Sequence, residues 1–251
     1  MNQSVYREPC MKLFLTAGEQ ISRRNVTVDV VRTLAIVLMV IFHFIYDLRF
    51  FNWVTWNIPN GDGWKHFRYV ILTLFFLCFG VGLVYSHAKK FNLSHFLLRL
   101  LKVSVGALLV TLMSLVMYPS SWVYFGVLHF IAVASILSII LIPYPRFALL
   151  AGVSVIALTN LGYLSIKWPF DYILNYLPNY TTDYVPIFPW VGVVWLGIAL
   201  GHTRMLNADV LKNIKHREGL SYPGKHSLII YLVHQPIMFL FLYPLSLFTR
   251  H

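Results

Sequence analysis

Residues 29–47 read DVVRTLAIVLMVIFHFIYD, and this stretch decides the fold class. Uncharged and almost wholly apolar residues fill the interval between Arg32 and His43. About 20 predominantly apolar residues are enough for a helix to cross a hydrocarbon layer of roughly 30 Å. The stretch therefore predicts a transmembrane helix that carries polar groups within its length and at both of its ends.

The composition of the whole chain agrees with a lipid environment. Of its 251 residues, 58% are hydrophobic and 12% are charged, and the mean hydropathy is +0.68. In soluble domains roughly a quarter of all residues are charged, so the composition excludes a soluble protein. The apolar runs lack the weak alternation of a membrane barrel, which leaves helices as the way to satisfy the backbone in lipid.

Apolar runs follow one another closely along the chain. The sequence predicts an all-α polytopic membrane helical bundle with about seven transmembrane helices. Residues 1–26 are expected to be a polar cytoplasmic tail, and residues 27–251 a single transmembrane domain. In the sixth predicted span, residues 185–202, Gly192, Gly197 and Gly201 are expected to permit close helix approach. The spans are expected near 29–48, 68–87, 99–118, 122–142, 146–164, 185–202 and 226–247.

The formal charge of +11 is spread over short loops between the apolar runs. The loops at 88–102 and 203–225 are rich in Lys and Arg and are expected to be cytoplasmic, which places the N-terminus in the cytoplasm as well. We therefore expect membrane lipid, and no nucleic acid, as the partner of these charges. Cys10 and Cys78 give no metal-ligand spacing, and we expect no metal.

Polar residues at membrane depth are the first candidates for a functional site. Arg32 and His43 are eleven residues apart and share one helix face, with His43 about 16 Å further out. Asp47 follows His43 by one turn, which suits a general base oriented by a carboxylate. Arg32, near the cytoplasmic surface, suits a phosphate-bearing ligand. His129, on the fourth predicted span, is expected at a depth close to that of His43.

The last predicted span adds Tyr231 and His234 to these candidates. Structural alternatives stay open for most of them. Arg32 could extend to the lipid headgroups, Asp47 could cap the outer end of its helix, and His129 or His234 could be packing residues held by hydrogen bonds. A purely structural His43 is a further alternative.

Four motifs resemble the bacterial relatives of heparan-α-glucosaminide N-acetyltransferase. They are the 32–48 stretch, FGVLH at 125–129, FPW at 188–190 followed by Gly192, and GKHSLIIYLVHQP at 224–236. The spacing of Arg32 and His43 is also similar to that in the wider transmembrane acyltransferase superfamily. The first loop lacks a match to the segment that carries the catalytic histidine of the family's lysosomal member, where His66 is a loose candidate.

The resemblance implies a membrane acyltransferase. It would transfer an acyl group, usually acetyl, from cytoplasmic acetyl-CoA to an amino or hydroxyl group of a sugar, glycan or lipid acceptor. We expect His43, Asp47 and His129 to be catalytic, and Arg32, Tyr231 and His234 to bind the coenzyme. The expected location is the bacterial inner membrane, and a homo-oligomer is left open. The alternatives are a small-solute or proton-coupled transporter and a non-catalytic membrane partner.

Overall fold

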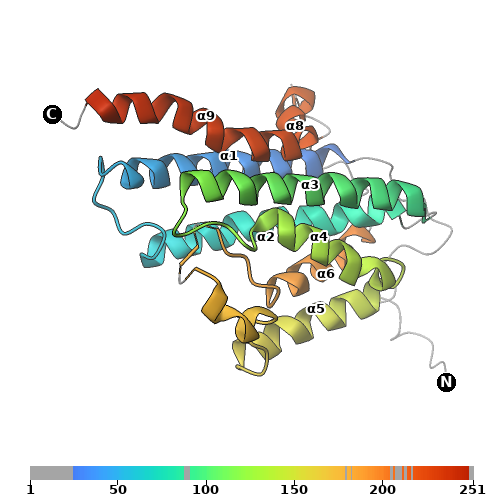
Figure 1. Ribbon diagram of the computed structural model, residues 1–251. Coiled ribbons are helices and arrows are strands. Elements are labelled where there is room, and N and C mark those ends of the chain that lie inside the picture. Colours follow the sequence, from blue (N-terminus) through green and yellow to red (C-terminus); the bar gives the residue numbers. More distant parts are fainter. Residues whose placement is uncertain are drawn as a thin grey trace, which may run out of the picture. The chain divides into compact units, whose positions relative to one another are not determined.

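The computed structural model describes residues 25–87, 91–178, 180–181, 183–203, 206, 211, 214–215 and 217–248 (Figure 1). Within these ranges the regular structure is helical, and no β-strand occurs. The predicted all-α class is confirmed for the described residues.

Four helices are long and apolar enough to cross a membrane: α1 (Val26–Phe50), α2 (Asp62–His87), α3 (Leu93–Met117) and α9 (Ser227–Phe248). They correspond to the first, second, third and last predicted spans. The other three predicted spans fall on shorter apolar helices, so the count of seven and the cytoplasmic N-terminus stay predictions. The shorter helices are α4 (Val127–Ser138, continued by the 3-10 turn η1, Ile139–Leu141), α5 (Pro145–Asn160) and α6 (Trp190–Gly201).

Several boundaries differ from those predicted. Helix α2 begins at Asp62 and α3 at Leu93, each earlier than the apolar run alone indicated. Asn92 caps α3, because its side-chain oxygen accepts a hydrogen bond from the backbone N–H of His95 at 3.1 Å. A further helix, α8 (Arg217–Lys225), lies where the sequence predicted only a charged loop. Two short 3-10 turns, η2 (Phe170–Tyr172) and η3 (Leu174–Tyr176), follow α5.

The described chain falls into two compact units. Unit 1 contains Asn25 and the described part of 76–210, with the second half of α2 and helices α3 to α6. Unit 2 contains 26–75 and the described part of 211–251, with α1, the first half of α2, α8 and α9. Whether they form the single membrane domain predicted from the sequence stays a prediction.

Glycines bring the helices of unit 1 into backbone contact. A Cβ added at Gly80 of α2 would overlap the backbone oxygen of Val194 in α6. A Cβ at Gly152 of α5 would lie 2.8 Å from the oxygen of Gly192 in α6, and the reverse distance is also 2.8 Å. The predicted role of the α6 glycines in close helix approach is thereby confirmed, since small residues are what allow helices to approach this closely.

The core of unit 2 joins α1, the following loop and the start of α2. Its buried members are Met39, Phe42, Ile58 and Ile71. Tyr231 of α9 packs against this cluster from the other end of the sequence. Helix α9 makes residue contacts with α1 and lies next to it in Figure 1.

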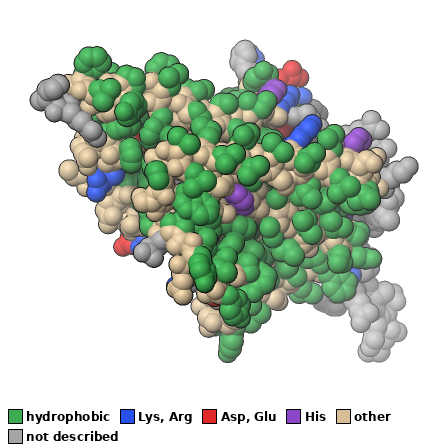
Figure 2. Space-filling model, in the orientation of Figure 1, with side chains coloured by type: hydrophobic (Ala, Val, Ile, Leu, Met, Phe, Trp, Pro, Cys, Tyr) green, Lys and Arg blue, Asp and Glu red, His purple; other side chains and the backbone are tan. Residues whose placement is uncertain are grey.

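Apolar side chains are exposed along the helices of both units. Hydrophobic groups cover much of the face in Figure 2, with few Lys, Arg, Asp and Glu side chains among them. Val116 of α3, for example, is 83% exposed, and Phe248 of α9 is 81% exposed. In water such surfaces would be too large for a soluble monomer, whereas lipid is the natural solvent for them. The chain is an integral membrane protein.

Candidate active site

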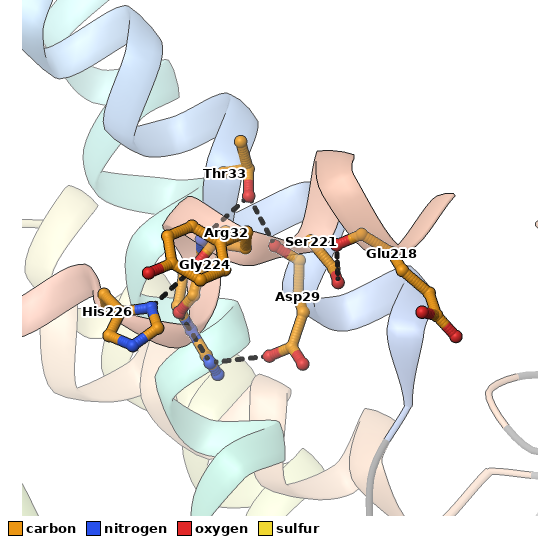
Figure 3. Close-up of polar contacts among 8 residues, drawn as sticks. Asp29, Arg32, Thr33, Glu218, Ser221, Gly224 and His226 are labelled. Atoms are coloured by element: carbon orange, nitrogen blue, oxygen red, sulfur yellow. Dashed lines mark hydrogen bonds and ion pairs between the residues drawn. The ribbon is translucent and has the colours of Figure 1, made fainter. Parts of the chain in front are cut away.

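The end of α1 that carries Arg32 meets helix α8. Nη1 of Arg32 contacts Oδ1 of Asp29 at 3.0 Å and the backbone oxygen of Gly224 at 3.5 Å (Figure 3). The side chains of Arg32 and Asp29 are 21% and 6% exposed, respectively. Arg32 and Asp29 are three residues apart on α1, a spacing at which side chains on a helix are neighbours.

Helix α8 is held against α1 at close range. The backbone N–H of Gly224 donates to the hydroxyl oxygen of Thr33 at 2.9 Å, and this hydroxyl donates to the backbone oxygen of Asp29 at 3.0 Å. A Cβ added at Gly224 would overlap the same oxygen of Asp29. Only glycine fits this approach, so Arg32 lies at a junction that the backbone of α8 helps to form.

Two histidines meet further along α1 and α9. The ring centroids of His43 and His234 are 4.9 Å apart, and the rings are nearly perpendicular, at 81°. Both side chains belong to unit 2. The structure therefore brings together a residue expected to be catalytic and one expected to bind the coenzyme.

Backbone carbonyls define the tautomers of this histidine pair. Nδ1 of His43 lies 3.0 Å from the oxygen of Met39, and Nδ1 of His234 lies 2.7 Å from the oxygen of Tyr231. A carbonyl oxygen can only accept, so each neutral ring carries its proton on Nδ1 and has its lone pair on Nε2. This tautomer leaves Nε2 suited to act as a base or nucleophile.

Asp47 is completely buried, at 0% exposure. Its Oδ1 accepts a hydrogen bond from Nε2 of Gln235, at 2.7 Å. The partner of Asp47 is therefore the amide of Gln235, whereas the sequence suggested an orienting contact with His43. The orienting group seen at Nδ1 of His43 is the carbonyl of Met39, one turn earlier on the same helix.

Three buried polar atoms around this pair have no hydrogen-bond partner among the described residues. They are Oδ2 of Asp47, Oε1 of Gln235 and Nε2 of His234. Buried polar groups are nearly always paired, and exceptions call for a functional explanation such as a bound group. Each of the three atoms can accept a hydrogen bond, so the site is suited to a group that donates N–H or O–H.

His129 lies in unit 1 and has both ring nitrogens engaged. Its Nδ1 accepts from the backbone N–H of Gly126 at 3.2 Å, at the start of α4. Its Nε2 is 3.2 Å from the hydroxyl of Thr111, which itself donates to the backbone oxygen of Val123 at 2.8 Å. These bonds link α3 to the start of α4 and favour the structural alternative for His129.

Tyr231 contacts His234 through its backbone carbonyl more closely than through its ring. Its carbonyl receives the Nδ1 proton of His234, while its ring centroid lies 5.7 Å from that of His234. Tyr231 also packs on the buried cluster around Phe42. It thus supports His234, and a contact of its hydroxyl with the coenzyme stays a prediction.

Sequence reasoning missed two members of the site, Gln235 and Gly224. Gln235 directly follows His234, but nothing in its spacing indicates that it would meet Asp47. Gly224 lies in a charged segment that also contains Pro223, a composition that predicts a loop. Among the described residues, no group of three or more His, Cys, Asp or Glu side chains could hold a metal ion.

The fold and these residues define a helical membrane protein with a buried polar site between its first and last long helices. Residues 24–236 match the family model of the catalytic region of heparan-alpha-glucosaminide N-acetyltransferase, and the chain belongs to this family. The resemblance noted in the sequence is thereby confirmed. Searches of the curated proteins and of the solved structures each found no match.

Proposed function

We propose that this protein transfers an acetyl group from cytoplasmic acetyl-CoA to an amino or hydroxyl group of a sugar, glycan or lipid acceptor. The observation that carries the proposal is the His43–His234 pair beside the buried Asp47–Gln235 bond, in a chain of an acetyltransferase family. The unpaired acceptor atoms at this site suit the N–H or O–H of an incoming nucleophile.

His43 is the proposed base. Its Nε2 takes the proton from the acceptor while the acceptor oxygen or nitrogen attacks the thioester carbonyl. The thiolate of coenzyme A then leaves and receives that proton from the imidazolium. In the second route, Nε2 of His43 itself attacks the thioester and displaces the thiolate of coenzyme A, which gives an acetyl-imidazolium. The acceptor then attacks this acetyl group, its bond to Nε2 breaks, and the proton of the acceptor passes to the departing thiolate. The Nδ1–H bond to the Met39 carbonyl supports both routes, because it directs the lone pair to Nε2.

Arg32 is the proposed contact for the coenzyme's phosphates. A guanidinium suits phosphate because it offers several N–H donors in a fixed plane. A phosphate of the coenzyme would share the guanidinium of Arg32 with Asp29, whose carboxylate already contacts Nη1. Displacing or sharing that ion pair lowers the net gain, so we expect Arg32 to contribute at the lower end of the range for a charged hydrogen bond.

The proposal is tested by binding of labelled acetyl-CoA to the purified full chain in nanodiscs. Saturable binding by the wild type, weakened in Arg32→Ala by about 1.5 kcal/mol, supports it. Arg146→Ala is the matched control, since it removes an exposed positive charge at the start of α5. A folded wild type that does not bind acetyl-CoA contradicts the proposal. Equal affinity of Arg32→Ala and wild type returns Arg32 to a structural role at the α1–α8 contact.

A further inference from the structure

Helix α5 gives unit 1 an exposed surface that is mainly aliphatic. Its large exposed side chains are Phe147, Leu149, Leu150, Val153 and Leu158. Neither Tyr nor Trp occurs between Pro145 and Asn160. In an integral membrane protein, side chains of this kind face the lipid hydrocarbon. The exposed face of α5 is thus part of the lipid-facing surface of unit 1.

The exposed side chains change in character where α5 ends. In residues 161–178, here called the aromatic segment, the exposed Tyr and Trp side chains are Tyr163, Trp168, Tyr172 and Tyr176. Tyr172 and Tyr176 are 89% and 87% exposed, respectively. Each of the four has an apolar ring with one polar group, the combination that is enriched at the boundary between hydrocarbon and water.

Other side chains hold the aromatic segment against unit 1. The ring centroid of Phe170 lies 4.9 Å from that of the buried Phe125. The hydroxyl of Tyr184 donates a hydrogen bond to the backbone oxygen of Ile166 at 3.0 Å. The segment therefore has an inward side that packs on the protein at the end of α5 (Figure 1), and its exposed tyrosines are available to another phase.

The length of α5 is close to the thickness of the hydrocarbon layer. Its 16 residues extend over about 24 Å, against roughly 30 Å for the hydrocarbon. Tyr144 is exposed just before the helix, and Tyr163 is exposed just after it. Aromatic residues with polar groups thus lie at both ends of an aliphatic helix, which is the arrangement of an interfacial aromatic belt.

The aromatic segment is nearly free of net charge. Its charged residues are Lys167 and Asp171, one of each sign. Oδ2 of Asp171 accepts a hydrogen bond from the hydroxyl of Ser165 at 3.0 Å, within the segment itself. Attraction to anionic lipid depends on an excess of Lys and Arg, so it contributes little here. The aromatic rings are the groups that would bind a lipid surface.

We propose that the aromatic segment lies along the membrane surface at the level of the lipid headgroups. The lipid-facing surface of α5 continues directly into the segment, and the exposed side chains pass from aliphatic to aromatic at that point. Tyr172 and Tyr176 place their rings at the edge of the hydrocarbon and their hydroxyls among the headgroups. This interaction is independent of the proposed acetyl transfer, whose residues His43 and His234 belong to unit 2.

The test measures the depth of spin labels on the purified full chain in nanodiscs. Tyr172→Cys and Tyr176→Cys carry the label in the aromatic segment, and Leu150→Cys carries it on the exposed face of α5. Cys10→Ser removes one natural cysteine, and the buried Cys78 stays in place. Cys10→Ser without an introduced cysteine is the labelling control. Accessibility to oxygen and to a water-soluble nickel chelate gives the depth of each label.

We expect the labels at Tyr172 and Tyr176 to lie within about 5–10 Å of the boundary between headgroups and acyl chains. The label at Leu150 should lie about 15 Å deeper, given its distance along the helix from Asn160. The depths should be equal in phosphatidylcholine and in equal parts of phosphatidylcholine and phosphatidylglycerol.

Four results would overturn the proposal, each at either position of the aromatic segment. Full exposure to the chelate would show that the segment faces water, where its rings could bind a glycan or another soluble partner. Low accessibility to both reagents would show that protein covers it. A depth equal to that at Leu150 would place the segment inside the hydrocarbon. A headgroup depth found only with phosphatidylglycerol would mean that charge, and not the aromatic rings, binds the lipid.

Discussion

The side-chain amide of Gln235 donates a 2.7 Å hydrogen bond to the fully buried carboxyl of Asp47, joining α9 to α1 across 188 residues of sequence. Burying a carboxyl without a hydrogen-bond partner is costly. Among the described residues, the amide of Gln235 is the partner of the Asp47 carboxyl, whose second oxygen has none. The pair therefore determines how the two helices meet beside His43 and His234, and its stability can be measured separately from catalysis.

Removing one partner of this hydrogen bond should lower the free energy of unfolding more than removing both partners. We expect Gln235→Leu to lower the free energy of unfolding by about 1–3 kcal/mol, because the carboxyl of Asp47 is then left unpaired. Adding Asp47→Leu should recover part of that loss, since two apolar groups replace the pair. Denaturant unfolding in detergent measures both. If the losses of stability in Asp47→Leu and Gln235→Leu simply add in the double variant, the two residues are not coupled.

Catalysis should depend on Nε2 of His43. We expect His43→Ala to lower the rate of acetyl transfer by roughly 10²–10⁴, the usual contribution of a positioned acid or base, with acetyl-CoA binding retained. His66→Ala is the informative comparison, because His66 is exposed and its Nδ1 contacts the backbone oxygen of Asp62 at 2.6 Å. An inactive His66→Ala together with an active His43→Ala would assign the chemistry to the first turns of α2. The assay is product formation from labelled acetyl-CoA once an acceptor is found.

His129 should matter for stability more than for chemistry. His129→Ala removes the bond to the Gly126 N–H and the contact with Thr111, and we expect a loss of about 1–2 kcal/mol in the free energy of unfolding. Thr111→Val should shift stability in the same direction. Folded His129→Ala protein is expected to keep its acetyl transfer rate. A variant as stable as the wild type but inactive would instead support the catalytic role that the sequence suggested.

Two glycines of α8 offer a matched pair of substitutions. A Cβ at Gly224 meets the backbone oxygen of Asp29, whereas a Cβ at Gly219 meets nothing within 4 Å. We expect Gly224→Ala to destabilise the α1–α8 contact and to weaken acetyl-CoA binding if Arg32 holds the phosphates. Gly219→Ala should stabilise the helix by about 0.5–1 kcal/mol. Thermal unfolding and acetyl-CoA titration compare the two, and equal behaviour would argue against a tight contact at Gly224.

Periodicity and hydropathy were enough to predict the long helices and to place Arg32 and His43 on one face of α1. The Arg32–Asp29 pair follows from spacing alone, since residues three apart on a helix are neighbours. Boundaries were less accurate because polar residues extend α2 and α3 beyond their apolar runs. Asp62 begins α2, and Asn92 caps α3, although neither belongs to a hydrophobic segment.

The partners of the site residues could not be read from the sequence. Asp47 and Gln235 lie at opposite ends of the chain, and a contact of this kind depends on how α1 and α9 pack. His43 and Asp47 are one turn apart, but each finds its partner elsewhere, on the carbonyl of Met39 and on Gln235. Spacing shows which residues can meet, and packing decides which ones do.

The glycine contacts of α6 have a mechanical consequence. Helix α6 touches α2 at Gly80 and α5 at Gly152 through backbone atoms, with no side chain between them to rearrange. Sliding either neighbour by one residue would bring a Cβ into a space that holds only a hydrogen. Within unit 1, α5, α6 and the part of α2 from Phe76 onward therefore have a single register and should move as one rigid piece. Any shear that accompanies the reaction must take place at interfaces built from longer side chains, which can change rotamer.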